Sequence, residues 1–166
     1  MNRSVLSFAL AFAVLAVLTA CTATRRWTAP ASASPIFQMR LVADAPSSES
    51  TEMSIIHQTE SLPRKEVLYV QTAVLLDQTA LKSAKVETDG LGHPQIAITF
   101  TEKGQQEFAE VTRQNIGKRL AIVIDGRLCS APRIMTEIPG GKAIVSGNFS
   151  ATEAEQLVAK TNASLR

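Results

Sequence analysis

The chain has 166 residues, which is enough for about one domain. It carries 17 basic and 15 acidic residues, a formal net charge of +2, and no basic run interleaved with aromatic residues. This balance gives no support to a nucleic-acid-binding function.

The first 20 residues are typical of a signal peptide. Asn2 and Arg3 form a short positive start, and residues 5–20 are almost wholly apolar. A helix over these residues spans roughly 24 Å, less than the ~30 Å hydrocarbon core, so a signal segment is favoured over a permanent membrane span. The segment ends in Leu18-Thr19-Ala20-Cys21, which resembles the bacterial lipobox.

This resemblance implies that the thiol of Cys21 takes a diacylglycerol and that Cys21 becomes the mature N-terminus. Several acyl chains, at about 0.8 kcal/mol per buried methylene, anchor a protein to a membrane. Thr22, where proteobacterial inner-membrane lipoproteins commonly carry aspartate, favours the outer membrane. The alternative is an uncleaved anchor with an incidental cysteine. The other cysteine, Cys129, is expected to be a small buried residue without a disulfide partner.

Residues 21–35 contain alternating Ala, Ser and Pro and are expected to form a flexible tether, followed by a domain over residues 36–166. Residues 37–42 alternate apolar and polar and predict a strand, as do residues 67–70. Residues 45–52, rich in Ser and Pro, predict a loop.

Asp77 is expected to cap one short helical turn, since its carboxylate can accept hydrogen bonds from the backbone amides that follow. Residues 85–88 and 95–100 flank the turn-rich residues 89–94 and predict a hairpin. Thr101 is expected to be the N-cap of an amphipathic helix that runs to about Ile116.

The stretch after this helix is the most ordered part of the sequence. Gly117 stands where the helix must end, because glycine adopts the left-handed conformation without a Cβ clash. Leu120–Ile124 is apolar at every position and predicts a strand covered on both faces. Asp125-Gly126 favours a type I′ turn, so Arg127–Ser130 is expected to return as a hairpin partner.

Pro132 lacks an amide donor and is expected to interrupt strand pairing, and residues 143–145 predict a final strand. Ser150 and Glu153 have the spacing of a capping box that opens a last helix. This order of strands, helix, strands and helix predicts an α+β fold, a mostly antiparallel sheet with two helices packed on one face.

The sequence offers no catalytic constellation. His57, His93 and Cys129 are far apart in the sequence and lack the spacing of a metal site. Neither a nucleophile elbow nor a phosphate-binding glycine loop is found. Asp77, Asp89 and Asp125 stand at predicted caps and turns, where aspartate is favoured for backbone reasons. We therefore expect a protein that is not an enzyme and that has no metal and no small-molecule cofactor.

Several of these motifs occur together in one known family. They are Leu75-Leu76-Asp77, Gly92-His93-Pro94-Gln95-Ile96, the run over residues 112–132, Gly147-Asn148-Phe149 and Glu153-Ala154. Residues 65–166 resemble the head region of the first periplasmic domain of the SecD family, accessory subunits of bacterial protein export. The matching positions are chiefly turns, caps and core residues, which transmit a fold better than a function.

In that family the chain continues into membrane-spanning helices that supply proton coupling, whereas this chain stops at Arg166. The first half of the family's base subdomain is also replaced by the tether. We therefore expect an envelope lipoprotein that faces the periplasm or the outer surface, without motor activity. The family's head is thought to contact emerging polypeptide, so the expected partner is unfolded or exported polypeptide. The alternative is a docking module for a folded envelope protein.

Overall fold

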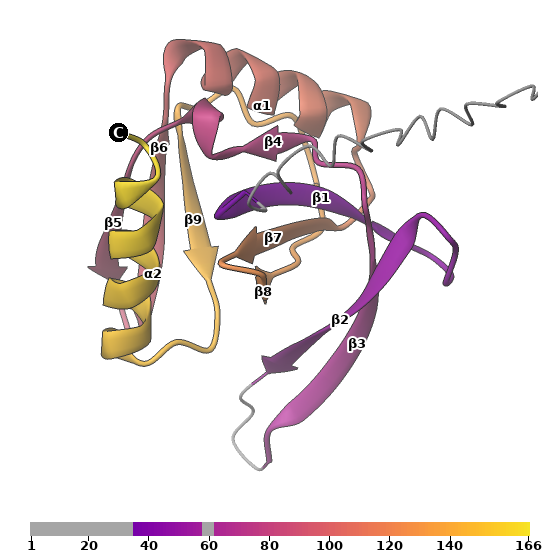
Figure 1. Ribbon diagram of the computed structural model, residues 1–166, viewed down its shortest axis with the longest axis horizontal. Helices are drawn as coiled ribbons and strands as arrows, with labels where there is room; N and C mark the ends of the chain where they lie inside the picture. The colour runs from indigo at the N-terminus through magenta and orange to yellow at the C-terminus, as the bar shows by residue number, and fades with distance from the viewer. Residues whose placement is uncertain (1–34, 58–61) are drawn as a thin grey trace, which may run out of the picture. The chain divides into compact units, whose positions relative to one another are not determined.

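The computed structural model describes residues 35–57 and 62–166 (Figure 1). The predicted signal peptide, the predicted lipidation residue Cys21 and the predicted tether up to residue 34 lie outside the described residues. Within the described ranges, the structure contains no helix with the length and apolar character that a membrane crossing requires.

The described elements, in chain order, are β1 (Phe37–Ala43), β2 (Ser50–His57), β3 (Arg64–Gln71), β4 (Leu76–Asp77), the 3-10 helix η1 (Gln78–Ala80), β5 (Leu81–Thr88), β6 (Pro94–Phe100), α1 (Glu102–Gln114), β7 (Leu120–Ile124), β8 (Arg127–Ser130), β9 (Lys142–Ser146) and α2 (Ala151–Ala163).

The strands form two sheets whose pairings are all antiparallel. The larger sheet has the order β2-β3-β1-β7-β8, with β4 also paired to β1, and the smaller has the order β5-β6-β9. α2 lies against β5 and β6, while α1 contacts η1, β4 and β6 (Figure 1). The predicted α+β class, mostly antiparallel with two helices, is confirmed. The strands divide between two sheets, which the sequence did not indicate.

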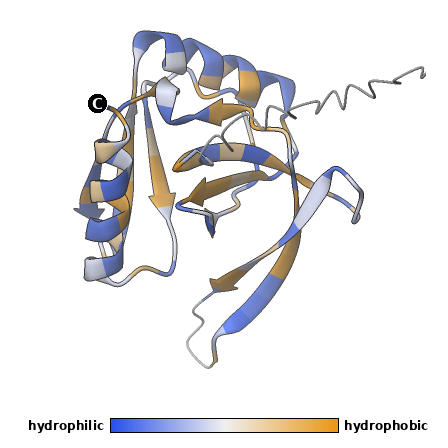
Figure 2. Ribbon diagram, viewed as in Figure 1, coloured by the Kyte–Doolittle hydropathy of each residue, from blue (hydrophilic) through white to orange (hydrophobic). Residues whose placement is uncertain are grey.

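β7 lies at the centre of the packing, and all five of its residues are buried. Leu120, Ile122 and Ile124 belong to the main core, which also receives side chains from both helices. Ala121 and Val123 point to the opposite face, where a smaller cluster contains residues of β2, β3 and β8. The prediction that this strand is covered on both faces is confirmed. Figure 2 shows hydrophobic residues along the strands and mixed hydropathy along both helices.

The predicted loop over residues 45–52 is wrong at its end, because β2 begins at Ser50 and continues to His57. This strand pairs with β3 over its full length. Only Ile55 of β2 is buried, so the strand lacks a strong alternating pattern. Its stability comes from pairing with β3 and from packing against the smaller cluster, neither of which a local window of sequence contains.

The predicted caps are confirmed. The Asp77 carboxylate accepts a hydrogen bond from the Thr79 amide at 2.8 Å, and the Thr101 hydroxyl accepts one from the Gly104 amide at 3.0 Å. Ser150 and Glu153 form the reciprocal capping box. α1 ends at Gln114, two residues before the predicted Ile116, with Asn115 as its C-cap.

Two glycines adopt the positive φ that the sequence predicted. Gly117, after α1, has φ 87°, and in the turn between β7 and β8 Asp125 has φ 52° and Gly126 has φ 74°. Positive φ at both central positions is the signature of a type I′ turn, which matches the right-handed twist of the flanking strands. The predicted hairpin of β7 and β8 is confirmed.

Replacing Gly126 with valine should lower the free energy of unfolding by more than about 1 kcal/mol, because a β-branched residue strongly resists positive φ. A Cβ at this position would meet no atom within 4 Å, so the cost is conformational rather than steric. Denaturant unfolding measures the change. Gly140→Val is the matched control, since Gly140 also has open space but no positive φ. Equal midpoints for Gly126→Val and the wild type would contradict this assignment of the turn.

Candidate functional site

β9 forms one of the two edges of the smaller sheet. It pairs with β6 on one side and with no other strand of the described residues. Beside it lies a groove of about 440 Å³, which we call the apolar groove. Its lining comes from Met39 of β1, Phe108 and Thr112 of α1, Leu120 and Ile122 of β7, the segment 132–138 except Glu137, and Lys142, Ala143 and Ile144 of β9.

The apolar groove reaches the backbone edge of β9. Side chains of consecutive strand residues point to opposite faces, and Ala143 packs against the main core while Ile144 is exposed. Both residues line the apolar groove, so the groove runs along the edge of β9 and contacts side chains from both faces of the strand. An unpaired strand edge presents a row of N–H and C=O groups that can pair with another extended chain.

Another wall of the groove is the segment 132–138, which follows the end of β8 at Ser130. The Leu120 amide donates to the Pro132 carbonyl at 2.8 Å, and the Ile134 amide donates to the Lys118 carbonyl at 2.8 Å. Farther along, the Ile138 amide donates to the hydroxyl of buried Thr112 at 3.0 Å. These bonds fix an irregular segment against α1 and the start of β7, so the groove is built into the fold.

Apolar side chains remain exposed along this groove. Met135 is 76% exposed, Ile144 is 47% exposed and Ile138 is 37% exposed. The floor, by contrast, is formed by buried side chains such as Met39, Phe108 and Leu120. An exposed apolar wall over a buried apolar floor favours the binding of apolar side chains from a partner.

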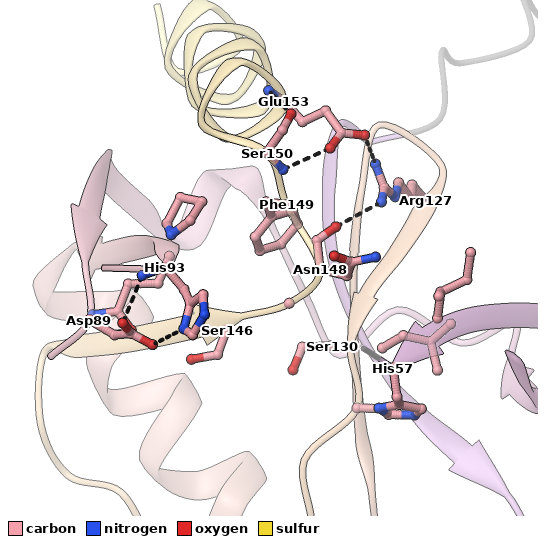
Figure 3. Close-up of a pocket in the computed structure, with 16 residues that line it drawn as sticks. His57, Asp89, His93, Arg127, Ser130, Ser146, Asn148, Phe149, Ser150 and Glu153 are labelled. Atoms are coloured by element: carbon pink, nitrogen blue, oxygen red, sulfur yellow. Dashed lines mark hydrogen bonds and ion pairs between the residues drawn. The ribbon is translucent and has the colours of Figure 1, made fainter. Parts of the chain in front are cut away.

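A second groove, of about 800 Å³, has a polar lining drawn from β2, the turn between β5 and β6, β8, and the start of α2 (Figure 3). Two pairs of lining side chains contact each other, Arg127 with Glu153 and His93 with Asp89. Arg127 donates to the Glu153 carboxylate at 2.9 Å. The pKa of Glu153 is lowered to about 2, first by the hydrogen bond from the Ser150 amide and then by the one from Arg127. Asp89 accepts from the backbone amide of His93, which lowers the pKa of Asp89.

The hairpin of β2 and β3 is held to the residue before β7 by the side chains of His57, Glu66 and Arg119, which we call the Glu66 clasp. The Glu66 carboxylate accepts hydrogen bonds from Arg119 at 2.7 and 3.3 Å and contacts Nε2 of His57 at 2.7 Å. Arg119 also donates to the Ala131 carbonyl at 2.9 Å. The hydrogen bonds from Arg119 and His57 lower the pKa of Glu66 to about 2.

Comparison with known proteins identifies the fold. The family model described as the SecDF P1 head subdomain matches residues 53–164. The chain belongs to this family.

The matched residues of this P1 head domain include every residue that lines the apolar groove except Met39 of β1. SecDF of Thermus thermophilus is 49% identical over 83 residues, which are 50% of this chain and 11% of that protein. SecD of Acidaminococcus fermentans is 32% identical over 120 residues, 71% of this chain and 28% of that protein. The chain thus spans only a small part of the length of these relatives.

A solved structure from a study of SecDF, a membrane component that enhances protein export, superimposes with a TM-score of 0.61. The superposition has 30% sequence identity and covers 76% of this chain and 61% of the solved chain. The structure of SecDF in a super-membrane-facing form gives a TM-score of 0.60 over the same share of this chain and 18% of the solved chain. The predicted resemblance to the SecD head is confirmed.

His57, His93 and Cys129, which the sequence shows far apart, have separate contacts in the described part of this P1 head domain. His57 and His93 line the polar groove from opposite sides (Figure 3), and each contacts its own carboxylate, Glu66 or Asp89. Cys129 is buried, and this burial raises the pKa of its thiol to about 11. Within residues 35–57 and 62–166, no three His, Cys, Asp or Glu residues are grouped as metal ligands.

The Glu66 clasp predicts a pH-dependent contribution to stability. Because the pKa of Glu66 lies below its ordinary value of 4.5, this contribution is present above about pH 4.5 and is lost as the pH falls toward 2. Glu66→Gln should lower the free energy of unfolding by about 1 kcal/mol at pH 7 and less at pH 2. Denaturant unfolding at both values measures this, with Glu52→Gln on the same hairpin as control. A deficit of equal size at both pH values would contradict the clasp.

Proposed function

We propose that this P1 head domain binds extended or unfolded polypeptide at the outer edge of β9, with apolar side chains of the client entering the apolar groove. The supporting observation is an edge of β9 that pairs with no other described strand, beside a groove that carries exposed Met135 and Ile144. Backbone hydrogen bonds to a strand edge make little demand on client sequence, and neighbouring pockets then select among side chains.

The relatives support an export-related client. Those reported above are named as protein translocase subunits, and SecDF is described as enhancing protein export. We carry over only the contact with polypeptide. The proton-coupled activity of the family is not part of this proposal, and the proposed contact requires no cofactor or catalytic step.

The proposal also includes a lipid anchor. Leu18-Thr19-Ala20-Cys21 supports attachment of lipid to Cys21, and the tether over residues 21–35 would hold the domain near a membrane of the bacterial envelope. A client must be released after each contact, so we expect dissociation constants that are micromolar or weaker.

A pair of matched substitutions tests the location of the binding site. Ile144 on β9 and Val67 on β3 are both β-branched strand residues, 47% and 44% exposed, and only Ile144 lines the groove. Fluorescence anisotropy with a labelled, permanently unfolded client measures affinity for the full chain in detergent. Ile144→Asp should weaken binding at least about five-fold, because it places a charge against an apolar groove, and Val67→Asp should leave binding unchanged. Equal affinities for the two variants would reject this site.

A further inference from the structure

Two cations lie on the walls of the apolar groove. Lys142 is the first residue of β9, and Arg133 belongs to the segment 132–138. Both side chains are exposed, so they border the groove where it meets solvent.

Neither cation has a carboxylate partner in the described part of the chain. The ion pairs found there involve other basic residues: His57, His93, Lys103, Arg113, Arg119, Arg127 and Lys160. Arg133 donates to the carbonyl of Gly117, which leaves its charge uncompensated. The two acidic residues of α1 that lie nearest the groove residue Phe108 along the chain, Glu107 and Glu110, pair with Lys103 and Arg113.

We infer that the apolar groove selects polypeptide segments in which acidic residues flank a short apolar stretch. This inference rests on the proposed function and specifies its client class. The residues that line the groove include two cations and no acidic residue, around an apolar floor. Such a lining is complementary to a strand whose centre is apolar and whose ends are negatively charged. The same cations disfavour clients with flanking lysine or arginine, since like charges repel across a shared groove.

The geometry also restricts where the client carboxylate lies. Lys142 is the first residue of β9, and Ile144 lies two residues along on the same face. A client strand paired with this edge would place an apolar side chain beside Ile144 and a side chain about two residues away beside Lys142. The acidic residue is therefore expected next to the apolar stretch rather than far from it in sequence.

Three capped peptides test the inference against the full chain in detergent. They share a centre of alternating valine and threonine and carry glutamate, glutamine or lysine at both ends; capping removes the terminal charges. The glutamate peptide should bind about three- to five-fold more tightly than the glutamine peptide at low salt, the range of an exposed ion pair. The lysine peptide should bind most weakly, and the difference should shrink in 1 M salt, where the Debye length is about 3 Å.

Charge reversal locates the effect. Lys142→Glu should reverse the order of affinities of the glutamate and lysine peptides. Lys82→Glu is the control, because it makes the same charge change on β5, the other edge strand of the same sheet, away from the groove. This control should preserve the order of affinities. Equal binding of all three peptides, or no change of order in Lys142→Glu, would overturn the charge selection while leaving polypeptide binding intact. Failure of every peptide and of the unfolded client to bind would overturn both this inference and the proposed function.

Discussion

Replacing Gly104 with alanine should destabilise the domain by about 3 kcal/mol or more, the largest effect that we expect from a single methyl group. Gly104 lies in the first turn of α1, where the helix crosses η1. A Cβ at this position would lie 2.1 Å from the backbone oxygen of Ala80 and 2.8 Å from its carbonyl carbon. Backbone atoms cannot rotate away as a side chain can, so α1 and η1 would have to separate.

This separation would also disturb the bonds that join the two elements. The Thr101 amide donates to the same Ala80 carbonyl at 2.9 Å, and Thr101 caps α1. Thermal and denaturant unfolding measure the loss. Gly90→Ala is the control, because a Cβ there meets nothing within 4 Å and the residue has no positive φ. Similar unfolding midpoints for Gly104→Ala and Gly90→Ala would contradict the close approach of Gly104 to the backbone of Ala80.

Replacing Cys21 with serine should abolish lipid attachment, because a serine hydroxyl does not replace the thiol that accepts the diacylglycerol in the proposed lipobox. We expect an unprocessed precursor without acyl groups, and metabolic labelling with a radioactive fatty acid followed by electrophoresis measures both properties. Cys129→Ser is the matched control, since Cys129 is buried in the domain and should not affect processing. Normal processing and unchanged labelling of Cys21→Ser would reject the anchor.

Local backbone chemistry explains why so much of the fold was predictable. Caps at Asp77, Thr101 and Ser150, and the turn at Asp125-Gly126, depend on a few neighbouring residues whose hydrogen bonds or φ values have few alternatives. The unbroken apolar run Leu120–Ile124 likewise predicts a strand buried on both faces. The two core clusters, which share the residues of β7 between them, confirm this prediction.

The parts that were not predicted depend on contacts between distant segments. β2 is polar at most positions and is recognisable as a strand only through its pairing with β3. The apolar groove brings together β1, α1, β7, the segment 132–138 and β9, so no local pattern reports it. The segment 132–138 contains three apolar residues, Ile134, Met135 and Ile138, whose spacing did not predict a helix or a strand. Only the tertiary structure shows that Ile134 is buried and that Met135 and Ile138 are exposed.

Residue-resolved NMR tests the proposed site of polypeptide contact most directly. The isotope-labelled full chain in detergent micelles is titrated with a permanently unfolded client, and amide shifts are followed across both sheets. We predict progressive shifts, with micromolar or weaker affinity, confined to β9, the segment 132–138 and the groove side of α1. An absence of shifts at millimolar client, together with capture of one folded envelope protein by the same chain, would contradict this account and favour a docking module.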